Sequence, residues 1–108
     1  MNFDVKTIDN FKRELKRLLK KFPSLRLEIE ELGLSLTNDP FQGTVMRDGF
    51  YKIRLSIKSK GKGKRSGARV ITCVKIVAET IYLVSIYDKS EQSDIPDGEL
   101  TRLLTEIP

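Results

Sequence analysis

The sequence is most informative in what it lacks. Its 108 residues include no histidine, no tryptophan and only one cysteine. Without histidine, the chain cannot use a Ser-His-Asp triad, a Cys-His pair or a histidine general base. One cysteine without histidine also argues against a zinc site, because such sites draw on several of these side chains. Any catalysis must therefore rely on lysine, arginine, tyrosine or carboxylate groups, and we expect no metal and no cofactor.

A second cysteine and a long apolar segment are also missing. Cys73 lies in the apolar run 70–77 and has no partner for a disulfide within the chain, so we expect a buried, unreactive thiol in a reducing compartment. No stretch of about 18 apolar residues is present, and residues 1–5 lack the apolar run of a signal peptide. We expect one domain over residues 1–108, located in the cytoplasm without membrane contact.

Acidic residues are absent from residues 49–78, although the chain contains 15 Asp and Glu in total. The basic residues inside this stretch are Lys52, Arg54, Lys58, Lys60, Lys62, Lys64, Arg65, Arg69 and Lys75. A local field of one sign attracts polyanions and raises their encounter rate. The plainer interpretation is a solvated basic loop, but the basic residues on the flanking strands favour an anion-binding face.

Hydrophobic periodicity predicts an α+β fold in the order β-α-α-β-β-β-α. The expected elements are a strand at 3–6, a helix at 8–22, a helix from 25 to the stop signal at 37–40, strands at 50–58, 68–77 and 80–87, and a helix at 97–107. Pro23 ends the first helix, and Ser24 is the expected N-cap of the second. The two helices should form an antiparallel hairpin packed on one side of a small, mainly antiparallel sheet.

Apolar and basic residues alternate in the strand at 50–58. The apolar set is Tyr51, Ile53, Leu55 and Ile57, and the polar set is Lys52, Arg54, Ser56 and Lys58. Because successive side chains of a strand point to opposite faces, the apolar set should cover the helices and the polar set should project from the other face. Residues 59–67 contain three glycines and predict a long, flexible basic loop.

Two apparent motifs fail on inspection. The Gly-Lys pair in the basic loop lacks phosphate-loop spacing, because Lys58 stands where the first glycine is required and Arg65 where Ser or Thr is required. Asp94, Asp97 and Glu99 are explained by the charge that favours a helix N-terminus better than by a metal site.

Four segments stand out in their order and spacing: residues 50–55 (FYKIRL), the loop 58–67, residues 68–71 (ARVI) and the run 86–95 (IYDKSEQSDI). Together they resemble the RelE/ParE superfamily, and specifically its HigB-like branch. The resemblance implies a RelE-like fold and the toxin component of a type II toxin–antitoxin system. Such a toxin is a ribosome-dependent endoribonuclease that cuts messenger RNA and is neutralised by a cognate antitoxin protein.

The same resemblance assigns candidate roles. Lys52 and Arg54 lie where RelE-type toxins carry catalytic cations, Arg69 matches an arginine that clamps the scissile phosphate, and Lys89 matches a basic residue near the C-terminus. Relatives also carry a tyrosine where this chain has Ile95-Pro96, so the general acid is unassigned between Lys89 and Tyr87. The residues expected to contact RNA without catalysing are Lys58, Lys60, Lys62, Lys64, Arg65 and, by base stacking, Tyr87.

Two other functions stay open at this point. One is a ParE-like toxin that inhibits DNA gyrase without cutting RNA, and the other is a catalytically decayed RNA-binding homologue. The ParE branch generally lacks the strand-borne cations, so Lys52 and Arg54 favour RNA as the target.

Overall fold

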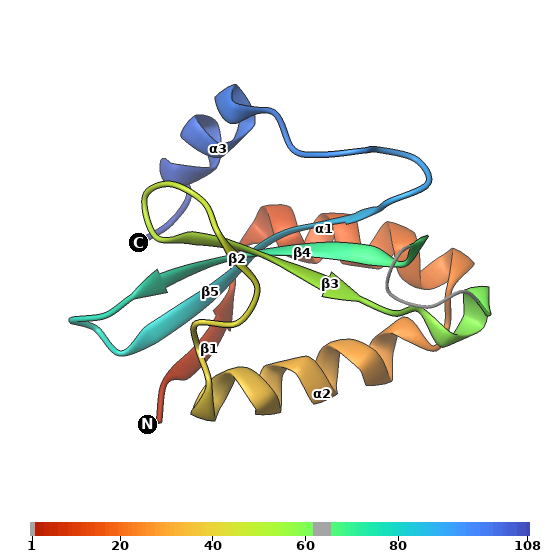
Figure 1. Ribbon diagram of the computed structural model, residues 1–108, viewed down its shortest axis with the longest axis horizontal. Coiled ribbons are helices and arrows are strands. Elements are labelled where there is room, and N and C mark those ends of the chain that lie inside the picture. The colour runs from red at the N-terminus through yellow and green to blue at the C-terminus, as the bar shows by residue number, and fades with distance from the viewer. Residues whose placement is uncertain (1, 62–65) are drawn as a thin grey trace.

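The computed structural model describes residues 2–61 and 66–108, so the predicted RNA contacts Lys62, Lys64 and Arg65 lie outside the described residues. The elements follow the predicted order with one additional strand (Figure 1). They are β1 (Asp4–Thr7), α1 (Asp9–Lys21), α2 (Leu25–Asn38), β2 (Thr44–Val45), β3 (Phe50–Leu55), the short 3-10 helix η1 (Lys58–Lys60), β4 (Ala68–Lys75), β5 (Thr80–Asp88) and α3 (Asp97–Leu104). The predicted α+β class is confirmed.

The five strands form one sheet in the order β1-β5-β4-β3-β2. Strands β2 to β5 pair antiparallel in sequence order, whereas β1 pairs parallel with β5. β1 and β2 lie at opposite edges of the sheet. The two helices between them form the long connection that such a separation requires. The sheet is therefore small and mainly antiparallel, as predicted.

The helices α1 and α2 form an antiparallel hairpin, with α1 behind the sheet and α2 below it in the view of Figure 1. Their buried apolar side chains are Phe11, Leu18, Leu25, Leu32 and Leu36, and these belong to the same core as the buried residues of the sheet. Fully burying one such side chain contributes about 1.5–3 kcal/mol. Helix α3 lies on the other side of the sheet from α2. None of the helices in residues 2–61 and 66–108 is long and apolar enough to cross a membrane.

Several predicted boundaries were wrong. β3 ends at Leu55 rather than at residue 58, because the chain turns into η1. β4 ends at Lys75, since Ile76 and Val77 form an exposed turn, and α3 ends at Leu104 rather than at residue 107. The missed strand, β2, has only two residues, both exposed, which is too short for alternation to reveal.

The first part of the predicted flexible loop is anchored to α2. The backbone N–H of Lys58 donates to Oε2 of Glu28 at 2.7 Å, and the N–H of Ser59 donates to the Ser24 hydroxyl at 2.9 Å. Ser24 is the N-cap residue of α2, but its hydroxyl also donates to Glu28 and makes no capping hydrogen bond to the helix. These contacts fix the end of β3 against the start of α2.

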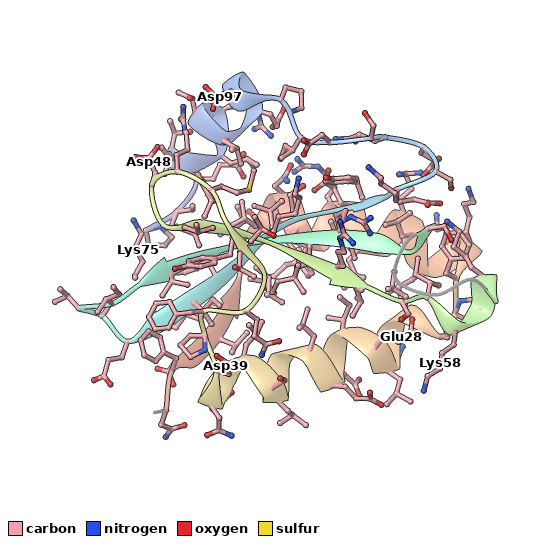
Figure 2. The ribbon with its side chains drawn as sticks, viewed as in Figure 1. Glu28, Asp39, Asp48, Lys58, Lys75 and Asp97 are labelled. Atoms are coloured by element: carbon pink, nitrogen blue, oxygen red, sulfur yellow. The ribbon has the colours of Figure 1, made fainter. Side chains whose placement is uncertain are left out.

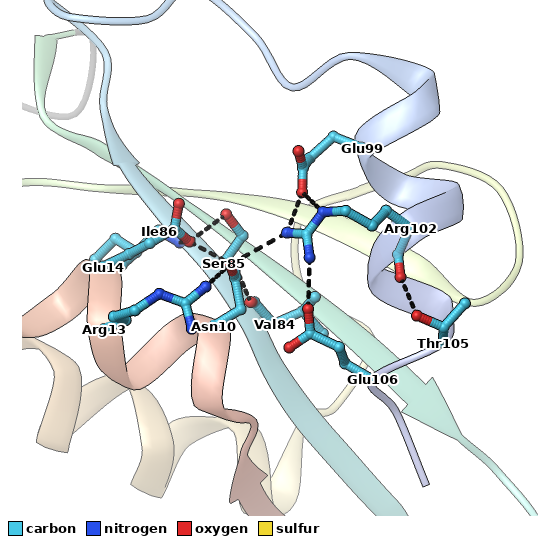
Figure 3. Close-up of polar contacts among 10 residues, drawn as sticks. All are labelled: Asn10, Arg13, Glu14, Val84, Ser85, Ile86, Glu99, Arg102, Thr105 and Glu106. Atoms are coloured by element: carbon cyan, nitrogen blue, oxygen red, sulfur yellow. Dashed lines mark hydrogen bonds and ion pairs between the residues drawn. The ribbon is translucent and has the colours of Figure 1, made fainter.

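A carboxylate from α1 closes the edge of β5 that β1 leaves unpaired (Figure 3). β1 pairs with β5 only as far as Leu83. Beyond that point, Oε1 of Glu14 accepts hydrogen bonds from the Ser85 hydroxyl at 2.8 Å and from the Ile86 N–H at 3.3 Å. It also accepts one from the side-chain amide of Asn10 at 2.9 Å. Glu14 therefore acts as a polar substitute for a neighbouring strand.

We predict that Glu14→Ala lowers the free energy of unfolding by about 1.5–3 kcal/mol, because it removes hydrogen bonds to a charged acceptor and leaves their donors unpaired. Urea denaturation followed by circular dichroism measures the change. Glu31→Ala, on the exposed side of α2, is the matched control and should stay within about 0.5 kcal/mol of the wild type. Equal losses in the two variants would contradict the role given to Glu14.

Candidate functional site

Strand register aligns a row of side chains across one face of the sheet. Arg54 of β3 lies opposite Arg69 of β4, and Arg69 lies opposite Tyr87 of β5. Residues directly opposite in antiparallel strands share a face and have neighbouring side chains. Lys52 lies on the same face as Arg54, because it is two residues earlier in β3.

A cavity of about 590 Å³ opens on this face. Among the described residues it is lined by Thr44, Lys52, Arg54, Arg69 and Lys89. The four cations that the sequence singled out thus border one cavity. Thr44 was missed, because it belongs to the two-residue strand that the sequence did not reveal. Arg54 is exposed and Arg69 is only 5% exposed, so the cations reach the cavity from different depths.

Two glycines let the strands beside the cavity approach closely. A Cβ on Gly67, just before β4, would collide with the carbonyl oxygen of Leu55. Gly43, just before β2, has a φ of +93°, and a Cβ there would collide with the carbonyl oxygen of Lys52. A larger residue at either position would push a neighbouring strand away from β3 and widen the spacing of the cavity's side chains.

Asp94 brings a carboxylate to the cations. Its Oδ1 accepts hydrogen bonds from Nζ of Lys52 at 3.0 Å and from the Ile95 N–H at 2.8 Å. The hydrogen bond from Lys52 holds the pKa of the Asp94 carboxyl below its usual value. Asp97 and Glu99 lie in the first turn of α3 as predicted, but for Asp94 that prediction was wrong. In residues 2–61 and 66–108, no group of three or more acidic or cysteine side chains gathers as a metal site requires.

Tyr87 is covered, although it shares the sheet face of Arg54 and Arg69. The residue is 3% exposed, so its ring is covered, which contradicts the predicted role in stacking a base. Burial, reinforced by the nearby Asp94 charge, raises the pKa of Tyr87 to about 12. The hydroxyl, 3.5 Å from Oδ1 of Asp94, therefore stays protonated at neutral pH and can donate a hydrogen bond.

Lys60 is held inside the structure instead of extending toward a ligand. Its Nζ donates to Oδ1 of Asp88 and to the Ser66 carbonyl oxygen, both at 2.6 Å, and the Lys60 and Asp88 side chains are 12% and 2% exposed. Burial opposes ionisation of Asp88, but hydrogen bonds from Lys60 and Ser90 hold the pKa of its carboxyl below the usual value. The predicted RNA contact at Lys60 is therefore replaced by a buried ion pair next to Lys89.

Lys58 and Lys89 differ in their relation to the cavity. Lys58 is exposed near Glu28, at the opposite end of the molecule from Lys75 (Figure 2), and borders a separate groove of about 330 Å³ beside α2. Lys89 lines the cation cavity, and its Nζ donates to the Ser93 carbonyl oxygen at 2.6 Å. Its backbone N–H donates to the Gly67 carbonyl oxygen at 3.0 Å, which ties the end of β5 to the start of β4.

No known protein-family profile matches the sequence. Among solved structures, the chain is similar to the E. coli toxin RelE in the free state, in a variant with two arginines replaced by alanine. The TM-score is 0.59 and the sequence identity 16%, over 98% of this chain and 94% of that chain. This likeness confirms the predicted RelE-like fold. Because one fold hosts many functions, the likeness does not by itself assign a chemistry to the cavity.

We predict that Asp88→Asn lowers the free energy of unfolding at pH 7 by about 3–5 kcal/mol, because it removes the counter-charge of a buried ammonium. The lowered pKa of Asp88 has a direct consequence for acid stability. Its stabilising effect is complete above the unfolded-state pKa of about 4 and is lost as the pH falls through the folded-state value.

The wild type should therefore lose more stability than Asp88→Asn between about pH 5 and pH 2. Urea denaturation across this range measures both effects. Asp97→Asn, which removes a carboxylate 75% exposed in its side chain, is the control and should change stability little. Parallel acid profiles for wild type and Asp88→Asn would refute the assignment.

Proposed function

We propose that this chain is the toxin component of a type II toxin–antitoxin system, a RelE-like endoribonuclease of the HigB-like branch. In this proposal residues 1–108 form one catalytic domain that cleaves messenger RNA on the ribosome, in the cytoplasm, until a cognate antitoxin neutralises it. The observation that carries the proposal is the cavity bordered by Lys52, Arg54, Arg69 and Lys89. The likeness to E. coli RelE supports it, because that protein is a toxin.

RNA can be cut at such a site without histidine. The 2′-hydroxyl of one nucleotide attacks the adjacent phosphorus, so an O2′–P bond forms and the P–O5′ bond breaks. The products are a 2′,3′-cyclic phosphate and a 5′-hydroxyl. Negative charge grows on the phosphoryl oxygens during this step, and preorganised cations stabilise it. Arg54 and Arg69 suit this task, because a planar guanidinium can donate two parallel hydrogen bonds to a phosphate.

The proton transfers fall to the lysines of the cavity. Lys89 is the candidate general acid, since it lines the cavity and its ammonium can give a proton to the leaving 5′-oxygen. Tyr87, the other candidate, is covered and is not among the described residues that line the cavity. Lys52 first leaves Asp94 and meets the RNA as an ammonium, and it must then lose a proton to solvent before it can take the proton of the 2′-hydroxyl, because an ammonium has no free lone pair. The strand-borne cation and the carboxylate beside it therefore have to separate during the reaction.

Contacts to the RNA backbone would extend the site. Lys58 is exposed, and Lys62, Lys64 and Arg65 follow it in the same basic stretch of the sequence. Such phosphate contacts position the nucleic acid without reading its sequence. Lys60 has no part in this proposal, because Asp88 holds its ammonium.

We predict that Arg54→Ala lowers the rate of messenger cleavage on ribosomes by roughly 10²–10³-fold, the loss typical of removing one group that stabilises developing charge. Arg54 is exposed, so this variant should fold normally. Arg69→Ala and Lys89→Ala should be similarly impaired. Lys12→Ala, an equal loss of charge on the exposed face of α1, should cleave at the wild-type rate.

The assay maps new 5′ ends on a translated message incubated with purified protein. Cleavage that persists in an Arg69→Ala/Lys89→Ala double variant would show that the cavity is not the active site. Gyrase inhibition by the wild type with intact messages would favour the ParE-like function instead.

A further inference from the structure

The segment between β5 and α3 places one carboxylate and one backbone carbonyl oxygen against two of the cavity's cations. Oδ1 of Asp94 lies 3.0 Å from Nζ of Lys52. One residue earlier, the carbonyl oxygen of Ser93 accepts a hydrogen bond from Nζ of Lys89 at 2.6 Å. Both ammonium groups that border the cavity are thus engaged by oxygens of residues 93–94, at the distances expected for ligand oxygens.

These contacts resemble those of a bound phosphodiester. A carboxylate, like a phosphate, offers two equivalent anionic oxygens to charged donors. An RNA phosphate entering the cavity would need the Lys52 ammonium and would be repelled by a carboxylate that stayed beside it. Asp94 and a phosphate therefore cannot both occupy this position.

The Asp94 side chain can separate from Lys52 at little cost. It is 60% exposed, and its partner Lys52 is 28% exposed, so the ion pair is of the weak, solvent-screened kind. Residues 89–96 contain no helix or strand, and rotation of one exposed side chain disturbs little of the core. By contrast, the neighbouring Lys60–Asp88 pair is buried and fixed.

We propose that the Asp94 carboxylate holds the place of an RNA phosphate in the cation cavity, and that RNA binds by displacing it from Lys52. This inference rests on the proposed function, since it takes the ligand to be RNA. It assigns Asp94 to the control of RNA affinity rather than to proton transfer. A carboxylate stabilised in its charged form by Lys52 and by the Ile95 N–H is a poor proton acceptor.

The test measures binding separately from cleavage. The probe is a fluorescein-labelled single-stranded RNA with every 2′-hydroxyl methylated, which cannot be cut because its internal nucleophile is blocked. Fluorescence anisotropy at low salt gives its affinity for the full chain. We expect Asp94→Asn to bind roughly two- to fivefold more tightly than the wild type, the range set by loss of an exposed ion pair. Asp94→Ala should shift the affinity in the same direction.

Two controls separate displacement from a general effect of charge. Asp97→Asn removes the same charge from a nearby carboxylate that pairs with Arg47 at 2.9 Å outside the cavity, and it should leave the affinity unchanged. In a Lys52→Met background, Asp94→Asn should gain much less affinity than in the wild type, because the ammonium for which RNA competes is gone.

Each outcome decides the inference. It is overturned if Asp94→Asn and Asp94→Ala bind the probe no better than the wild type, if Asp97→Asn gains as much, if the gain persists without Lys52, or if none of the proteins binds the probe. Ribosome-dependent cleavage by the wild type is measured in parallel. Tighter binding by Asp94→Asn without any wild-type cleavage would contradict the proposed function and support the inference. Wild-type cleavage without tighter binding by Asp94→Asn would support the proposed function and contradict the inference.

Discussion

The register between β3, β4 and β5 is the constraint on which the site depends. It sets Arg54 opposite Arg69, although like charges directly opposite in a sheet repel each other. The other face explains why this register holds, because Ile53, Val70 and Ile86 are opposite one another there and all are buried. A slip of one residue would exchange the two faces. The core therefore fixes the cations in positions that they would not adopt on their own.

Two carboxylates offset this concentration of charge in different ways. Asp88 is buried against Lys60, and Nζ of Lys60 also donates to the Ser66 carbonyl oxygen. The pair therefore holds the end of β5 next to the residues that precede β4. Asp94 is exposed against Lys52, and it neutralises part of the positive charge of the cavity. Breaking a buried pair is strongly destabilising, whereas an exposed pair is worth little. The Asp88 carboxylate thus stabilises the fold, whereas separating the Asp94 carboxylate from Lys52 would cost little.

Much of the fold could be predicted from the sequence, because its signals are local. The 3.6-residue periodicity before Pro23 and the alternation through Lys52 and Arg54 gave the helical hairpin and the faces of β3. The fates of Lys60 and Asp94 could not be predicted in this way. Each depends on a partner far away in the sequence, at Asp88 and at Lys52, and such pairings follow from strand register rather than from composition. Charge distribution pointed to Lys52, Arg54 and Arg69 as part of an anion-binding face. Their catalytic roles, and the choice of Lys89, came from the resemblance of their segments to a known family, while Thr44 gave no signal at all.

In the function proposed here, the sheet face bearing Lys52, Arg54 and Arg69 binds RNA phosphates. Backbone amide chemical shifts of the isotope-labelled chain, titrated with uncleavable methylated RNA, test it most directly. We expect the shift changes to be concentrated at residues 52–54, 69, 87–89 and 94, and the binding to weaken as salt is added. Shifts confined to the exposed turn at Ile76 and Val77 or to the outer face of α2 would contradict it.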